Sequence, residues 1–524
     1  MEFVEVLIGL LAASVALAYA ARHARMPSAV ALVLGGMALA FVPNVPRVEL
    51  DPHIALAFFL PPLLQVSAYR TDWAAFRSAL RPILLLALGA VVFTAAAVAA
   101  VTKALAPELP WAACVALGAI VAPPDAVAAS AVLKTTRIPR RLVTILEGES
   151  LLNDASSLIL YRAAIAATAA GSVALGDAAS SFVLSALGGT AIGYVMGRLA
   201  IAATIALEDT LLEIAAGVLA GFACYFAAEA FGLSGVLAAV ACGLVIGVRQ
   251  HEAMSARTRV ASTAVWDFIE FVLTSLVFIL IGLQLRDVAG RLGAYSAADL
   301  AALALATSAT LILSRFVWVF GTSGLPRLLG FRRATLRPTH LAVISWAGMR
   351  GVVSLAAALA LPVEFPGRDL IIFLAFCAIL VTLVLQGTTL GWLIRRLGVV
   401  EAAAEEGVSP EARIRREAAV AALETIENRL FNGRVLGLPD ADMLRQYRRM
   451  RDNAEAMIAG HGLAAKRREA RLQLELAAAH AARRAVLDRA GTIDGELLQS
   501  LEEEFDFDEG RLRRALGEGG AHAG

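Results

Sequence analysis

Charged residues are scarce in this chain of 524 residues. Only 17% of the residues are charged, whereas 59% are apolar, and the mean hydropathy is +0.71. Soluble globular proteins carry about 25% charged residues. The formal net charge is +1, so the basic surface that nucleic-acid binding needs is not expected. The composition therefore favours a membrane protein over a soluble enzyme.

Cysteine is also rare, and its placement indicates neither a disulfide framework nor a metal centre. The four cysteines lie singly in apolar stretches, at Cys114, Cys224, Cys242 and Cys377. No pair of cysteines has CxxC spacing, and the seven histidines include no HExxH motif. The sequence also contains no P-loop, so the use of ATP is not expected.

Long apolar runs fill the first 400 residues. A helix needs about 20 apolar residues to cross the hydrocarbon core of a bilayer. Thirteen segments are candidates: 3–21, 28–44, 53–69, 82–102, 111–133, 142–170, 179–203, 209–230, 233–248, 262–285, 297–320, 338–362 and 369–394. The first run opens with Glu2 and Glu5 rather than basic residues, which favours a retained span over a signal peptide. The sequence predicts an all-α membrane protein with thirteen transmembrane helices.

The basic residues of the predicted loops indicate the orientation. Loops after odd-numbered spans hold 16 Lys and Arg, and loops after even-numbered spans hold 5. The positive-inside rule places the first set in the cytoplasm. The N-terminus is then outside and the C-terminus cytoplasmic. Only three of the 46 basic residues are lysine, which fits a GC-rich bacterial genome, and we expect an inner-membrane location.

Residues 401–524 have a different composition. They contain 19 Lys and Arg and 23 Asp and Glu, close to half of the chain's 46 basic and 45 acidic residues. Segments rich in Ala, Arg, Glu and Leu predict helices at 410–431, 439–458 and 464–490, and a short helix is predicted at 493–498. We therefore expect a transmembrane domain at 1–400 and a small helical cytoplasmic domain at 401–524.

Two prolines interrupt the span predicted at 111–133. Pro123 and Pro124 remove backbone donors in mid-span and break the helix, and Asp125 follows directly. Non-helical backbone at this depth is tolerated only where it lines protein or a watery cavity. A simple kink is the alternative, but an ionisable residue inside a membrane marks a functional site by default.

The span predicted at 142–170 carries a cluster of oxygen donors. Ser150 and Asp154 are four residues apart on one helix face, and Glu149 and Asn153 are four apart on the adjacent face. Oxygen donors suit hard cations. The cluster predicts a cation site, with a polar lock between helices as the alternative.

Two arginines lie inside later spans. Arg350 stands between Gly348 and Gly351 in the span at 338–362, which suggests a second broken helix. Arg315 lies in the otherwise apolar span at 297–320. One of these arginines should neutralise a buried acid.

The two broken spans are seven apart in the order of spans. Spans 1–6 and 8–13 then form two six-helix repeats of opposite orientation, with span 7 between them. This inverted-repeat plan is typical of secondary transporters, whose site lies where the broken helices meet.

Three motifs together resemble the sodium/proton exchanger superfamily. Residues 149–154 read ESLLND, residues 123–126 read PPDA, and residues 346–351 read WAGMRG. Residues 271–282, FVLTSLVFILIG, are similar to its span-10 signature. The resemblance covers about residues 1–400 and is to the Asn-Asp branch of monovalent cation/proton antiporters.

The resemblance implies electroneutral exchange of Na⁺ or Li⁺ for H⁺ by a homodimer in a lipid membrane, with roles in pH homeostasis and sodium tolerance. It implies that Asp154 is the carboxylate shared by H⁺ and the cation. Ser150 and the backbone around Pro123 and Pro124 would be further ligands.

The resemblance also implies the supporting residues. Asn153 and Asp125 would tie span 6 to the broken span 5. Glu149 would pair with the span-11 arginine, Arg315, and Arg350 would supply the fixed charge at the second break. This sequence departs from the family at one point. The break usually reads Thr-Asp-Pro in the family and reads Pro-Asp-Ala here, at residues 124–126. The threonine hydroxyl is therefore missing, and the resemblance does not say which group replaces it as a ligand.

Three alternatives remain. Antiport of K⁺ for H⁺ uses the same oxygen ligands. A cation channel or sensor could keep the fold without exchange. An intramembrane aspartyl protease needs a Gly-x-Gly-Asp motif, and the nearest match, residues 174–177, lacks the first glycine.

Overall fold

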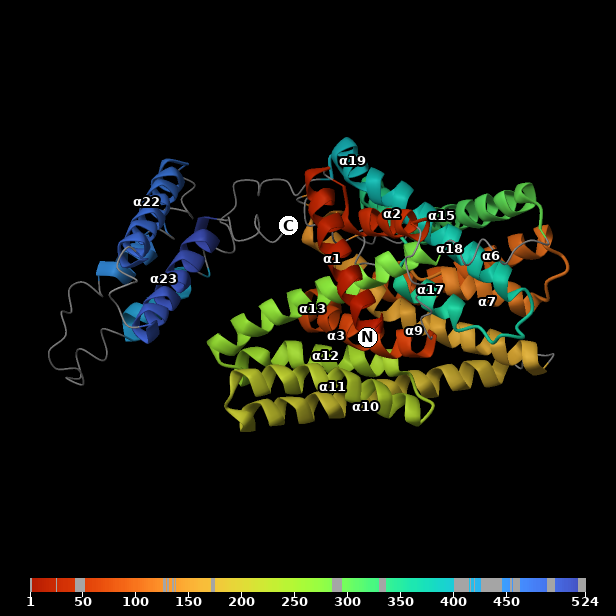
Figure 1. Ribbon diagram of the computed structural model, residues 1–524, viewed down its shortest axis with the longest axis horizontal. Coiled ribbons are helices and arrows are strands. Elements are labelled where there is room, and N and C mark those ends of the chain that lie inside the picture. Colours follow the sequence, from red (N-terminus) through yellow and green to blue (C-terminus); the bar gives the residue numbers. More distant parts are fainter. Residues whose placement is uncertain are drawn as a thin grey trace. The chain divides into compact units, whose positions relative to one another are not determined.

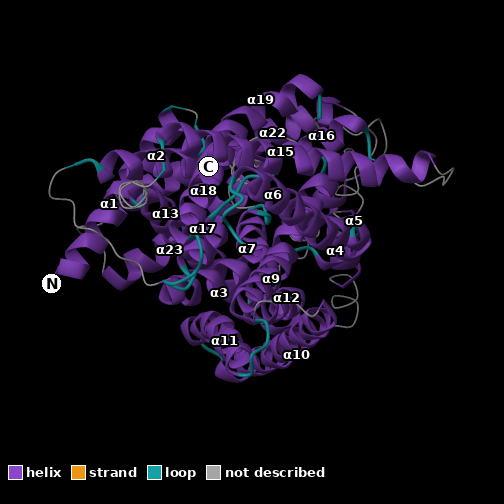
Figure 2. Ribbon diagram, turned by 90° about the vertical axis from the view of Figure 1, so that its right-hand side faces the viewer, coloured by secondary structure: helices purple, strands orange, loops and turns teal. Residues whose placement is uncertain are grey.

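The computed structural model divides the chain into two compact units, Met1–Val400 and Glu401–Gly524. It describes residues 2–24, 26–42, 52–125, 129, 132–133, 136, 138–170, 175–284, 295–328, 336–399, 414, 416–418, 420–425, 445–452, 455, 462–487 and 495–516. Every regular element in these ranges is a helix (Figure 2). The all-α class predicted from the sequence is confirmed for this part of the chain.

The helices of the first unit follow the predicted spans closely. Its first part contains α1 (Glu2–His23), α2 (Ser28–Ala40), α3 (Pro52–Arg70), α4 (Trp73–Ser78), α5 (Leu80–Leu84), η1 (Leu85–Ala90), α6 (Val91–Leu105), α7 (Trp111–Val121) and α9 (Arg140–Ala170). Its second part contains α10 (Leu175–Leu207), α11 (Thr210–Ala230), α12 (Gly235–Ala253), α13 (Ala256–Leu283), α15 (Ala297–Leu328), α16 (Pro338–Trp346), α17 (Val352–Leu359), α18 (Arg368–Val381), η2 (Thr382–Gln386) and α19 (Gly387–Leu397).

Eight helical stretches among the described residues are long and apolar enough to cross a membrane. They are Glu5–His23, Leu80–Leu105, Val183–Leu207, Thr210–Ala230, Gly235–Ala253, Ala256–Leu283, Ala297–Ser323 and Arg368–Leu397. The other predicted spans overlap with α2, α3, α7, α9 and the pair α16 and α17, and α7 covers only the first part of the span predicted at 111–133. The total of thirteen spans and the inverted repeat therefore stay predictions.

The helix breaks expected from proline and glycine are present. Helix α7 ends at Val121, and residues 122–125 are not helical. Helix α16 ends at Trp346 and α17 begins at Val352, so five residues between them leave the helical path. Each break brings irregular backbone into the interior of the first unit.

Glycine allows α2 and α13 to cross at close range. A Cβ on Gly36 would lie 2.3 Å from the carbonyl oxygen of Ile279, and a Cβ on Gly282 would lie 2.3 Å from that of Val33. No side chain fits at either glycine. Small residues at such crossings let membrane helices gain van der Waals contact between their backbones.

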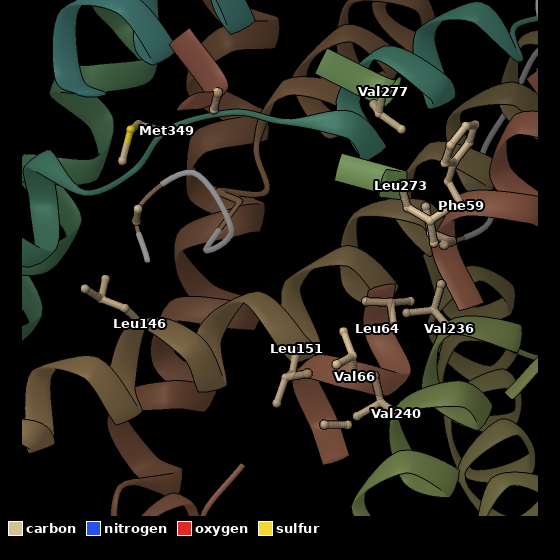
Figure 3. Close-up of a cluster of buried hydrophobic side chains, with 14 of the residues drawn as sticks. Phe59, Leu64, Val66, Leu146, Leu151, Val236, Val240, Leu273, Val277 and Met349 are labelled. Carbon is tan, nitrogen blue, oxygen red and sulfur yellow. The ribbon is translucent and has the colours of Figure 1, made fainter. Parts of the chain in front are cut away.

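A large apolar cluster packs several helices around the centre of the unit. Figure 3 shows its members from α3, α9, α12 and α13: Phe59, Leu64, Val66, Leu146, Leu151, Val236, Val240, Leu273 and Val277. Helices α10, α11 and α12 lie side by side along one edge (Figures 1 and 2). The cluster surrounds the region in which the breaks lie, because Met349 of the second break is also a member.

The second unit contains two long helices that pack against each other, α22 (Gly462–Leu487) and α23 (Gly495–Leu516). The short helix predicted at 493–498 was therefore wrong in length, since α23 extends through the acidic run that follows. Within α23, Asp508 pairs with Arg511 at 3.2 Å and Glu509 pairs with Arg513 at 2.7 Å. Acids that precede bases by three or four residues stabilise a helix and complement its dipole.

Ion pairs also join α22 to α23. His480 Nε2 lies 3.1 Å from Glu509 Oε1, and Arg483 Nη1 lies 3.0 Å from Asp506 Oδ1. The hydrogen bond from His480 lowers the pKa of the Glu509 carboxyl, with a smaller contribution from Arg513. Because the folded-state pKa is lowered, this contribution to stability is present above the ordinary glutamate pKa and is lost as pH falls through the lowered value.

Replacing Glu509 by Gln should loosen the pair of helices at neutral pH, because it removes the carboxylate that faces His480. Partly exposed ion pairs are worth about 0.2–1 kcal/mol each, so amide hydrogen exchange in α22 and α23 of the full chain should become up to about fivefold faster. Glu475→Gln is the matched control, since its partner Arg471 lies on the same helix, 2.8 Å away. Equal exchange rates in the two variants would contradict the conclusion that the Glu509 carboxylate stabilises the packing of α22 against α23.

Candidate functional site

The two breaks are joined directly. The backbone N–H of Asp125 donates to the carbonyl oxygen of Met349, with an N···O distance of 2.7 Å. The Asp125 carboxylate packs on Gly351, where a Cβ would lie 1.7 Å from Oδ2. Gly351 immediately precedes α17, so this carboxylate lies at the N-terminal end of a helix, where negative charge is stabilised. Glycine is needed at position 351 for space, not for backbone conformation.

Arg350 caps the broken end of α7. Its side chain is 1% exposed, and its Nε donates to the carbonyl oxygen of Val121 at 2.6 Å. The guanidinium also donates to the carbonyl of Gly348, and the backbone N–H donates to Thr382 Oγ1 at 3.1 Å. The last carbonyls of a helix lack partners within it and carry partial negative charge. Arg350 donates a hydrogen bond to a terminal carbonyl of α7 and places a positive charge at the negative end of that helix.

Arg315 has the corresponding position at α16 and also holds a buried acid. Its Nε donates to the carbonyl of Ile344 at 3.1 Å. Its Nη1 and Nη2 donate to the two carboxylate oxygens of Glu149 at 2.5 and 2.7 Å. The side chains of Arg315 and Glu149 are 3% and 1% exposed. Of the two arginines that the sequence offers, the structure pairs Arg315 with Glu149.

Helix α9 is attached to the first break by polar side chains. Asn153 Nδ2 donates to the carbonyl of Pro124 at 2.8 Å, and Ser157 Oγ donates to the carbonyl of Ala119 at 2.7 Å. Both donors are buried. The amide of Asn153 thus supplies a hydrogen bond to backbone that the two prolines leave outside a helix.

A cavity of about 180 Å³ lies beside the break. Four of the residues predicted from the sequence line it: Asp125, Ser150, Asp154 and Pro123. The other predicted residues do not line it and pack around it instead: Glu149, Asn153, Pro124, Arg315 and Arg350. The predicted set therefore divides into a group at the cavity and a group that holds the surrounding backbone.

The rest of the lining comes from α3, α13, α17 with the preceding Gly351, and Glu147 and Leu151 of α9, and most of it was not predicted. Arg70, at the end of α3, forms ion pairs of 2.6 Å with both Asp267 and Glu270 of α13. In the sequence, Arg70 directly follows the span predicted at 53–69, so it is expected in a loop and not at a site. Glu270 carried a usable signal, because it is an acid within a predicted span. The hydroxyls of Thr274 and Ser354 also line the cavity, and nothing in the sequence separates them from other hydroxyls in helices.

The chemistry of the cavity suits a small hard cation or a proton. It brings the carboxylates of Asp125 and Asp154 together with several hydroxyls, and oxygen donors are the ligands that hard cations prefer. Asp154 is 7% exposed. Among the described residues, no basic side chain forms an ion pair with Asp154. Within the described part of the chain, a negative charge on Asp154 is therefore not compensated by an ion pair.

Comparison with known proteins agrees with this chemistry. Residues 10–396 match the family described as sodium/hydrogen exchanger, transmembrane. A Mycobacterium bovis protein, named as an uncharacterized Na⁺/H⁺ exchanger, is 35% identical over 444 residues, which are 81% of this chain and 80% of that protein. A sodium, potassium, lithium and rubidium/H⁺ antiporter of Bacillus pumilus is 34% identical over 375 residues, 68% of this chain and 56% of that protein.

A solved structure has the same fold. The sodium proton antiporter MjNhaP1 from Methanocaldococcus jannaschii matches with a TM-score of 0.61 and 18% identity, over 76% of this chain and 100% of that one. The broken helices and the oxygen-lined cavity, taken with these matches, define a secondary transporter and not an enzyme. The chain belongs to the sodium/hydrogen exchanger family, and it is a multi-pass membrane protein that exchanges monovalent cations for protons.

Neutralising either member of the buried pair, by Glu149→Gln or Arg315→Ala, should lower stability strongly. Removing one partner of a buried ion pair typically costs about 3–5 kcal/mol, because the other charge stays uncompensated. Thermal unfolding of the detergent-solubilised protein measures this. Arg162→Ala is the control, since Arg162 is 51% exposed and its pair with Glu229 should contribute about 0–1 kcal/mol. If Arg315→Ala were as stable as the unmodified chain while Arg350→Ala were not, the compensating arginine would be Arg350.

Proposed function

We propose that this chain exchanges Na⁺ or Li⁺ for H⁺ at a single site, the carboxylate of Asp154. The supporting observation is that this nearly buried carboxylate lines a cavity with Asp125 and Ser150 and has no basic partner among the described residues. A buried charge is unfavourable unless it is compensated. A proton neutralises the carboxylate and a cation balances it, so each displaces the other.

One-for-one exchange follows because only Asp154 changes its partner during the cycle. Its neighbour Asn153 is uncharged, and its amide holds the carbonyl of Pro124. The carboxylate of Asp125 stays against Gly351, at the N-terminal end of α17. Each cycle then moves one cation and one proton in opposite directions with no net charge, and it uses no ATP or cofactor.

Potassium is the alternative cation. The Bacillus pumilus relative carries potassium as well as sodium in its name, and both ions bind through oxygen ligands. Ion-specific exchange in everted membrane vesicles distinguishes them, because the cation that this chain transports will dissipate an imposed pH gradient at the lower concentration. A channel or sensor would show no such coupling of cation to proton.

The wider setting of the site is also part of the proposal. The excess of basic residues after odd-numbered spans supports an N-terminus outside and a cytoplasmic tail unit in a bacterial inner membrane. We expect a homodimer. None of the described residues of the tail unit is among those that line the cavity, and its proposed role is to modulate transport and not to perform it.

Asp154→Asn should abolish exchange while the protein still folds and inserts, because the amide neither binds a proton nor balances a cation. The measurement is the Na⁺-induced loss of an imposed pH gradient in everted vesicles that contain equal amounts of protein. Asp299→Asn, at an exposed acid in the first turn of α15, is the control and should be fully active. Normal Na⁺-dependent proton movement in the Asp154 variant would exclude the proposed mechanism.

A further inference from the structure

The first break offers the cation few oxygen atoms. Pro123 and Pro124 have no side-chain oxygen, and the carbonyls of Val121 and Pro124 already accept hydrogen bonds from Arg350 and Asn153. Hard cations of similar size take about six oxygen ligands in proteins. The carboxylates and the Ser150 hydroxyl leave that shell incomplete, so a further ligand is expected from another element that lines the cavity.

Ser354 on α17 is placed to be that ligand. Its side chain is 1% exposed and lines the same cavity as Asp154 and Ser150. Among the residues that the structure describes, its Oγ has no hydrogen-bond partner. A buried hydroxyl without a partner is unfavourable, so such groups in native proteins need an explanation.

Two other hydroxyls serve as comparisons for Ser354. Ser345, on the other half of the same broken helix, is equally buried, but its Oγ donates to the carbonyl of Leu341 at 2.8 Å. Thr274 of α13 also lines the cavity, and its Oγ1 is likewise buried without a partner among the described residues, although the residue as a whole is only half-buried. Ser354 combines a buried, unpartnered hydroxyl with a position three residues after Gly351, on which the Asp125 carboxylate packs.

The electrostatics of this position favour a cation. Ser354 lies in the first turn of α17, where the helix dipole alone would repel positive charge. The Asp125 carboxylate packs on Gly351 at the same helix end and offsets that dipole, and Asp154 supplies a second negative charge to the cavity. A hydroxyl oxygen keeps two acceptor lone pairs for such an ion.

We propose that Ser354 Oγ is a ligand of the transported cation and replaces, from α17, the hydroxyl that the first break lacks. This inference rests on the proposed function, because it adds a ligand to the site at Asp154. The proposal distinguishes the state in which the site holds a cation from the state in which it holds a proton. The cation needs the Ser354 oxygen, whereas a proton on Asp154 does not.

Ser354→Ala in the full chain should therefore weaken cation binding more than it slows transport. In proteoliposomes we expect the half-saturating Na⁺ concentration to rise about tenfold, with the maximal rate within about twofold of normal. Ser354→Thr, which keeps the hydroxyl, should restore the half-saturating concentration. Ser345→Ala is the matched control and should leave it unchanged. The rise in thermal stability on adding Na⁺ gives a second readout that does not require transport.

Three results would overturn the assignment: an unchanged half-saturating concentration in Ser354→Ala, an equal effect in Ser345→Ala, or no restoration by threonine. Failure of the proposed function itself has a different signature, which is exchange that persists in Asp154→Asn or is missing in the unmodified chain. If the unmodified chain is active, Asp154→Asn is inactive and Ser354→Ala binds Na⁺ normally, only the role of Ser354 is wrong.

Discussion

Carbonyl groups at a helix end that is broken inside a bilayer need donors from the protein or from a watery cavity, because the lipid core offers none. Arg350 supplies the donor at the end of α7, and Arg315 supplies it at the end of α16. Each guanidinium also compensates the negative end of its helix, and Arg315 is neutralised in turn by Glu149. These contacts let the two breaks persist side by side, joined by the hydrogen bond from Asp125 to Met349.

Four of the charged residues around the breaks divide into two groups with different roles. Glu149 and Arg315 lie outside the cavity lining and neutralise each other in an ion pair. Asp125 and Asp154 line the cavity, and Asp154 forms no ion pair with a basic residue in the described part of the chain. The first group stabilises a fixed framework. The second leaves a charge that a transported ion compensates, which is the physical basis of coupling in the proposed mechanism.

The features that the sequence predicts well are those that are unfavourable in a membrane. Inside an apolar span, a proline such as Pro124 indicates a helix break, and charged residues such as Glu149 and Arg315 indicate a buried pair or a functional site. Ser354 was not predictable, because hydroxyls are common in membrane helices and only the folded structure shows which one lacks a partner. Glu270 was detectable as an acid within a predicted span, but its partner Arg70 was not, because their ion pair joins helices that are far apart in the sequence. The length of α23 was underestimated because part of its stabilisation comes from ion pairs with α22 that the sequence does not show.

The central claim is that one carboxylate, Asp154, holds either a proton or a cation. Its most direct test is the half-saturating Na⁺ concentration of the purified full chain, measured in proteoliposomes over a series of pH values. Competition at one site predicts that this concentration rises about tenfold for each unit by which pH falls, on the acid side of the titration, while the maximal rate at saturating Na⁺ stays constant. A half-saturating concentration that does not change with pH, or that rises about a hundredfold per unit, would contradict exchange at a single carboxylate.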